Sequence, residues 1–457
     1  MERDLSFGIY IHWPYCLSKC PYCDFYKEVR KDVNQEDIIN SYIADLDFYH
    51  SLTADREVTS IFFGGGTPSL IKPSLIAKII NHITKSWKIA SDVEVSLEAN
   101  PNSHYPNMFS QLRSSGINRL SLGVQALNED DLRFLGRTHS LSQAYQAIDE
   151  VLHNFDNHSI DLIYARPQQN TENWVRELKQ AAALGLKHIS LYQLTIEPNT
   201  VFAKKKVQLP DEEIATEMYL ATEAELSRFG YKKYEVSNYA QAGFASKHNL
   251  IYWTGGEYIG VGPSAHGRLT SFDGNLEQNS DARNSRTDLY AQVSALRDFT
   301  PSSSSKPVKS LRDGNLEQNS DARNSRTDLY AQVSALRDFT PSSSSKLVKS
   351  LSDEKQEQNF DARRYKRFYA TVHRCQLEEI SCEERAEELL LMGLRLVEGI
   401  NKADFTDICG INIYDFINQN HFQSLKQGGY IEEDEKYIRV TVKGFPILDF
   451  ITLQLVA

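Results

Sequence analysis

The stretch Phe7-Gly-Ile-Tyr-Ile-His-Trp13, followed at once by the loop Cys16-Leu-Ser-Lys-Cys20-Pro-Tyr-Cys23-Asp-Phe25, decides the fold of this chain. The first run is rich in apolar and aromatic residues and predicts a buried strand. Three thiolates spaced C-x3-C-x2-C on one loop can hold three irons of a 4Fe–4S cube and leave the fourth iron open. The spacing therefore predicts a cluster that binds a further ligand.

The cysteines allow three other interpretations. Zinc usually takes four ligands, often as two separated pairs, and here His12 would have to complete the set from within the strand. A disulfide is disfavoured because no signal-peptide pattern precedes the motif. Unrelated thiols are a poor explanation for such a cluster when 457 residues contain only six cysteines. The others, Cys375, Cys382 and Cys409, show no ligand spacing and are interpreted as free or buried thiols.

Composition excludes several classes of protein. The net charge of −11 argues against broad binding to nucleic acid. No apolar run approaches the length of a membrane span, and we expect a cytoplasmic protein of two or three domains.

Six strand-like segments alternate with amphipathic helical segments in the first two hundred residues. This order predicts a parallel α/β sheet with right-handed crossovers, curled into a partial (β/α)6 barrel. The expected strands are Phe7–Trp13, Val58–Phe63, Val93–Leu97, Arg119–Gly123, Ser159–Tyr164 and His188–Leu194.

Polar and glycine-rich motifs follow these strands. Gly64-Gly-Gly-Thr-Pro68 comes after the second strand, and Glu98-Ala-Asn-Pro101 after the third. Gln125 ends the fourth strand, and Asp161 lies on the fifth. Because the carboxyl ends of parallel strands meet at one edge of a sheet, we expect these groups to face the cysteine loop across one mouth.

An internal repeat interrupts the chain. Residues 273–312 and 313–352 differ at two positions only, and polar and apolar positions are equally identical, which predicts a duplicated, flexible insertion. The C-terminal part predicts helices followed by a hairpin, as in a winged-helix-like α+β domain, with an acidic run at 432–435 that argues against DNA binding. The expected domains are a core at 1–240, a connecting region at 241–272 plus 353–382, the insertion at 273–352, and a C-terminal domain at 383–457.

Four motifs together resemble one known family. They are the tyrosine-to-phenylalanine stretch 10–25 around the cysteines, Phe-Gly-Gly-Gly-Thr-Pro-Ser69, Ser-Leu-Gly-Val-Gln125 and His248-Asn-Leu-Ile-Tyr-Trp253. The chain, apart from the insertion, is similar to the oxygen-independent coproporphyrinogen III oxidases, and within them to the HemW branch of radical S-adenosylmethionine (SAM) haem chaperones. Oxidases of this family carry a further cysteine where this chain has Phe25. One departure is that the family run Gly-Leu-Pro-Gly-Gln-Thr reads Ala165-Arg-Pro-Gln-Gln-Asn170 here.

The resemblance implies the site residues. It assigns the 4Fe–4S cluster to Cys16, Cys20 and Cys23, and the haem contact to His248, Tyr252 and Trp253, although a lone histidine beside aromatic residues is also a common core residue. It assigns SAM to Tyr10, Tyr22, Gly66, Thr67, Pro68, Glu98, Gln125, Arg137 and Asp161.

The resemblance also implies the function. We expect a chaperone that binds haem and transfers it to an acceptor protein, which can be membrane-associated, with an electron donor such as flavodoxin or ferredoxin and a homodimer as further partners. The alternative is an enzyme that oxidatively decarboxylates coproporphyrinogen III to protoporphyrinogen IX. Radical modification of RNA is disfavoured by the net charge.

Overall fold

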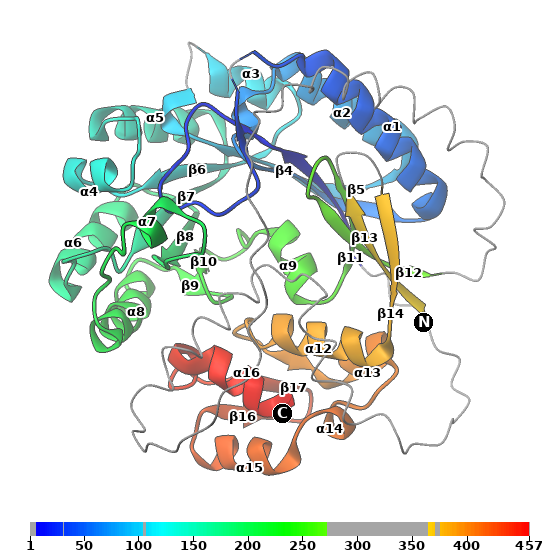
Figure 1. Ribbon diagram of the computed structural model, residues 1–457, viewed down its shortest axis with the longest axis vertical. Helices are drawn as coiled ribbons and strands as arrows, with labels where there is room; N and C mark the ends of the chain where they lie inside the picture. The colour runs from blue at the N-terminus through cyan, green and yellow to red at the C-terminus, as the bar shows by residue number, and fades with distance from the viewer. Residues whose placement is uncertain (1–5, 31, 104–106, 272–363, 371–374, 457) are drawn as a thin grey trace, which may run out of the picture. The chain divides into compact units, whose positions relative to one another are not determined.

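The computed structural model describes residues 6–30, 32–103, 107–271, 364–370 and 375–456 (Figure 1). The predicted insertion at 273–352 lies outside the described residues.

One large sheet carries the first part of the chain, and the predicted parallel α/β fold is confirmed. All six expected strands are present and lie side by side as parallel neighbours: β1 (Phe7–Trp13), β4 (Glu57–Gly65), β5 (Lys88–Ala99), β6 (Arg119–Gln125), β7 (Asn157–Tyr164) and β8 (His188–Gln193). A seventh parallel strand, β11 (Glu257–Val261), pairs with the free side of β1 and was not predicted. The sequence did not predict this strand because it contains Gly260, and glycine weakens a strand pattern.

Antiparallel strands extend both edges of the parallel sheet. They are β9 (Lys232–Lys233) and β10 (Asn238–Ala240) beside β8, and β12 (His266–Ser271), β13 (Arg364–Ala370) and β14 (Cys375–Ile380) beside β11. Two short parallel strands, β2 (Tyr15–Cys16) and β3 (Glu28–Val29), pair with each other. Their pairing closes the loop that carries the second and third cysteines of the motif.

Helices lie around the outside of the curved sheet, while α9 (Lys247–Trp253) lies on its inner side (Figure 1). Local signals start several of them: Pro73 occupies the first turn of α2, and Ser140 forms a capping box with Gln143 at α5. The outer helices are α1 (Gln35–Thr53), α2 (Pro73–Ser86), α3 (Met108–Ser114), α4 (Glu129–Phe134), α5 (Leu141–Asn154), α6 (Thr171–Ala182), α7 (Val201–Lys204) and α8 (Glu212–Ser227).

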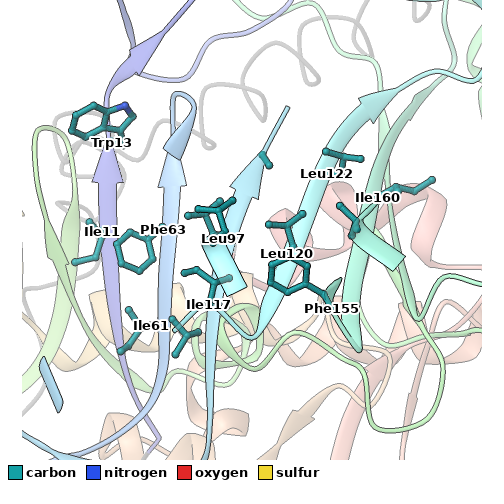
Figure 2. Packing of buried hydrophobic residues seen from close by; sticks show 14 of the residues in the cluster. Ile11, Trp13, Ile61, Phe63, Leu97, Ile117, Leu120, Leu122, Phe155 and Ile160 are labelled. Carbon is teal, nitrogen blue, oxygen red and sulfur yellow. The ribbon is translucent and has the colours of Figure 1, made fainter. Parts of the chain in front are cut away.

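The two faces of the sheet differ in polarity. Apolar side chains such as Ile11, Phe63 and Leu120 are buried in the hydrophobic core cluster drawn in Figure 2. The alternate positions of the same strands carry polar or aromatic side chains, among them Glu98 and Asp161, which line a cavity on the inner face. The period of two residues along each strand thus separates a core from a site.

The C-terminal domain has its own apolar core. Ser381 caps its first helix in a capping box with Glu384, and this helix ends at Gly393. Asn418 caps the helix that begins at Gln419. The elements are α12 (Cys382–Gly393), β15 (Ile400–Asn401), α13 (Lys402–Cys409), α14 (Ile413–Phe416), α15 (Gln419–Gln427), β16 (Ile431–Glu433), β17 (Tyr437–Val440) and α16 (Leu448–Val456).

The loop between β7 and α6 keeps a backbone suited to glycine. Ala165 and Gln168 both have a positive φ, +56° and +63°. These are the two positions at which the similar family has glycine. The chain thus holds two side chains other than glycine in the left-handed region at these positions.

We expect Gln168→Gly to raise the free energy of unfolding by about 0.5–1 kcal/mol, because it relieves left-handed strain at an exposed position where no packing is lost. Gln146, exposed on α5, is the matched control, and its change to glycine should lower stability by about 1 kcal/mol. Urea unfolding of the three proteins measures both effects. Equal losses in the two variants would contradict the strain at Gln168.

Candidate functional site

The cysteine loop leaves β1 at the mouth of the sheet. Cys16 is buried, whereas Cys20 and Cys23 are half-buried, and a backbone hydrogen bond of 3.3 Å from Cys23 N–H to the Cys20 carbonyl closes the turn between them. Burial raises the pKa of the Cys16 thiol. Phe25, which stands where the oxidases have a further cysteine, is 68% exposed and points to solvent rather than into the loop.

A chain of hydrogen bonds links two of the three cysteines through residues from other strands. Thr67 donates its hydroxyl to Cys16 Sγ at 3.4 Å, and Asn100 donates its amide to Thr67 Oγ1 at 3.1 Å. Arg137 then donates to Asn100 Oδ1 and, through Nη1, to Cys20 Sγ at 3.3 Å. Donors of this kind orient thiolate ligands and tune the redox potential of a cluster.

The thiols suit a multi-iron cluster better than a single metal ion. Within the described part of the chain, no three His, Cys, Asp or Glu side chains gather closely enough to hold one ion. A cube binds each thiolate to a different iron and needs no such convergence. His12, the fourth ligand in the zinc alternative, has both ring nitrogens engaged, with Tyr10 Oη at 3.0 Å and the Tyr26 carbonyl at 3.2 Å.

The glycine run after β4 packs directly under the cysteine loop. The N–H of Gly66 donates to the Trp13 carbonyl at 2.7 Å, and that of Thr67 donates to the Tyr15 carbonyl at 3.0 Å. A Cβ at Gly66 would lie 2.8 Å from the Tyr15 carbonyl oxygen, so only glycine permits this approach. The amide of Gly65 is also occupied, by Glu98 Oε2 at 3.2 Å. The amides of Gly65, Gly66 and Thr67 are therefore already engaged by the protein itself.

Glu98 and Asp161 lie in one cavity of about 70 Å³ on the inner face of the sheet. Burial, with the charge of Asp161 as a second cause, raises the pKa of Glu98 to about 8. Burial also raises the pKa of Asp161, which accepts a hydrogen bond of 2.9 Å from the Ser121 hydroxyl. A cation bound between these two carboxyls would favour their ionised forms.

Among the other predicted SAM residues, Gln125 and Arg137 lie beside Gly123, and Arg137 also contacts Cys20. Gln125 ends β6 with a φ of +76°, and a Cβ at Gly123 would lie 2.9 Å from Gln125 Nε2 and 3.1 Å from Asn100 Oδ1. Arg137 donates to the Gly123 carbonyl at 2.9 Å, so these polar groups converge over Gly123. Tyr10 lies on the inner face, Tyr22 packs against Phe202, and Pro68 begins a short 3₁₀ turn.

Sequence reasoning missed several residues of the site. Asn100 was noticed only as part of a motif, although it joins Thr67 to Arg137. The cavity is also lined by Arg119, Ser121, His188, Ser190 and Tyr192, none of which was predicted. The sequence pattern that could have identified them is the alternation of polar and apolar residues along β6 and β8.

The predicted haem residues lie on α9 and close the inner side of the sheet. His248 is 1% exposed, its Nδ1 lies 2.7 Å from Ser60 Oγ, and its Nε2 lies 2.8 Å from Tyr252 Oη. Its ring stacks on Phe62 at 5.0 Å, and burial lowers its pKa to about 3. Trp253 Nε1 is buried without a hydrogen-bond partner among the described residues. Asn249, next to His248, lines the same cavity as Glu98.

Comparison with known proteins agrees with this architecture. The model of the radical SAM superfamily matches residues 10–181, and that of the HemN C-terminal domain matches residues 380–447. The heme chaperone HemW of Buchnera aphidicola subsp. Schizaphis graminum is 42% identical over 270 residues, which cover 59% of this chain and 72% of that protein. The chain belongs to the HemW-like family of radical SAM proteins. Membership implies a 4Fe–4S cluster and SAM.

Two further relatives and one solved structure are similar to this chain. The heme chaperone HemW of Escherichia coli K12 is 38% identical over 284 residues, covering 61% of this chain and 74% of that protein. Radical S-adenosyl methionine domain-containing protein 1 of Dictyostelium discoideum is 30% identical over 98% of this chain and 94% of its own. The structure of the Escherichia coli coproporphyrinogen III oxidase HemN covers 99% of this chain and 91% of its own, with a TM-score of 0.66 and 17% identity, and shows the shared fold.

We expect Cys20→Ser to lower the iron and sulfide content after anaerobic reconstitution at least about tenfold, because a lost thiolate leaves too few ligands to retain the cube. Cys382→Ser, at a half-buried thiol in α12, is the control and should keep the content of the parent protein. Full iron and sulfide in the Cys20 variant would refute the assignment.

We expect Glu98→Gln to stabilise the apoprotein by about 1 kcal/mol or more at pH 8, with the difference shrinking toward pH 5. The raised pKa means that the folded state holds a proton that the unfolded state releases above about pH 4.5, so this contribution to stability is lost as pH rises through about 8. Urea unfolding across this range measures it, with the exposed Glu129→Gln as control. A difference independent of pH would count against the buried proton.

Proposed function

We propose that this protein is a haem chaperone that binds haem and passes it to an acceptor protein, and that it carries a 4Fe–4S cluster and SAM. One observation carries the proposal: proteins named heme chaperone HemW are 42% and 38% identical to this chain over 72% and 74% of their own length. A membrane-associated acceptor, a flavodoxin- or ferredoxin-like electron donor and a homodimer belong to the same proposal.

The cysteine loop and the cavity below it suit the two resident groups. Cys16, Cys20 and Cys23 would hold the cluster, whose open iron would accept the amino-acid end of SAM. Glu98 and the carbonyls of the glycine run would receive the ammonium group, and Arg137 the carboxylate. Tyr10, Tyr22, Gly66, Thr67, Pro68, Gln125 and Asp161 would complete the binding site.

The predicted haem contacts at His248, Tyr252 and Trp253 would require α9 to rearrange. Axial ligation needs a free imidazole nitrogen, and both nitrogens of His248 are occupied in the buried ring. Haem binding through His248 would therefore break its bonds to Ser60 and Tyr252 and withdraw the ring from Phe62. This predicts slow association of haem, limited by the release of α9.

A haem titration of the anaerobically reconstituted protein, followed by absorbance, tests the proposal. We expect saturable binding of one haem per chain, weakened about tenfold or more in His248→Ala because an axial ligand is lost. Ser60→Ala should bind haem faster than the parent, since one of the two bonds that hold the imidazole is gone.

His82→Ala is the matched control, because His82 is a surface histidine paired with Asp47 on the outer helices. Thermal unfolding of each variant checks that the fold is kept. Absence of saturable binding in the parent would overturn the chaperone proposal, and anaerobic turnover of coproporphyrinogen III would then support the oxidase instead. Equal affinity in parent and His248→Ala would remove His248 from the haem site.

A further inference from the structure

A buried ion pair lies beside the candidate SAM site. Arg166 is 1% exposed and donates with both terminal nitrogens to the carboxylate of Glu177 on α6, one of them at 3.2 Å. Glu177 is buried as well. A two-point pair of this kind fixes the direction of a carboxylate as well as its position.

The carboxylate of Glu177 is bound on its other side by the backbone that follows β6. Its Oε1 accepts the N–H of Leu127 at 2.7 Å. Leu127 is two residues beyond Gln125, whose φ of +76° is unusual for a side chain other than glycine. Strained backbone persists where its surroundings hold it. The Glu177 bond is one such restraint, and it acts on the segment that aims Gln125 at the site.

The same guanidinium reaches the helix that precedes Arg137. Arg166 Nη2 lies 3.0 Å from Asp131 Oδ2, and Asp131 is on α4. The N–H of Arg137 donates to the carbonyl of Leu132 at 2.9 Å at the end of that helix. Arg166 thus touches the supports of both Gln125 and Arg137 without touching the site.

We infer that Glu177, held by Arg166, is a positioning residue for SAM: it sets the backbone that carries Gln125, while Arg166 steadies α4 ahead of Arg137. The inference rests on the proposed binding of SAM at this site. The inference depends on the hydrogen bond that the Leu127 N–H donates to Glu177, because charge alone would not direct the backbone.

A variant that lacks only one partner of the ion pair is a poor test of this inference. Loss of Arg166 alone leaves a buried carboxylate with its charge uncompensated, which costs about 3–5 kcal/mol and can unfold the chain. Replacing both partners by uncharged residues of similar size is often tolerated. The informative comparison is therefore between two double variants that both lack the ion pair.

Arg166→Leu with Glu177→Gln keeps an amide oxygen that can accept the Leu127 N–H, whereas Arg166→Leu with Glu177→Leu does not. SAM affinity of the cluster-reconstituted proteins is measured by equilibrium dialysis, well below the melting temperature of each. We expect the leucine–leucine variant to bind SAM about tenfold more weakly than the leucine–glutamine variant. Iron content should be equal in the two, because the cysteines are unchanged.

Equal SAM affinity in the two double variants would overturn the inference. If the leucine–leucine variant fails to fold, Glu177→Gln and Glu177→Met replace the pair, with Arg166 still held by Asp131, and the same tenfold difference is expected. Failure of the parent protein to bind SAM would instead refute the proposed function, and this result is separate because it does not depend on any variant.

Discussion

The hydrogen bonds donated by the Arg137 guanidinium hold the parts of the site together. It joins Cys20 on the loop after β1, Asn100 after β5 and the Gly123 carbonyl on β6, three segments that are far apart in the sequence. Asn100 continues the contact to Thr67 and so to Cys16. A planar group with several fixed donors can hold such different acceptors at once, which a lysine ammonium would do less rigidly.

The two faces of the parallel sheet differ in polarity. Strands β4 to β8 give one face to the helices and the other to the cavity, so the alternation of side chains along each strand separates an apolar core from a polar interior. Carboxyls enclosed in this interior are hard to ionise, as the raised pKa of Glu98 shows. A cationic ligand in this interior would favour the ionised forms of these carboxyls.

The inner face is closed by α9, and this joins the predicted haem residues to the predicted SAM residues. Asn249 lines the cavity of Glu98, and His248 is stacked against Phe62 of the same cavity. Any movement that frees His248 would also change the lining of that cavity. If haem binds through His248 and SAM binds beside Glu98, as proposed, occupancy of one site would affect the other, because His248 and Asn249 are neighbours on one short helix.

Local periodicity and spacing in the amino-acid sequence predict the order of strands and helices, the cysteine loop and the glycine run. The sequence did not predict the strand β11, because this strand contains a glycine. Tertiary contacts set the rest: Asn100 bonds to both Thr67 and Arg137, the amides of Gly65 and Gly66 are occupied, and Glu177 accepts the Leu127 N–H. Such contacts join residues distant in sequence, and strand register and helix packing set them.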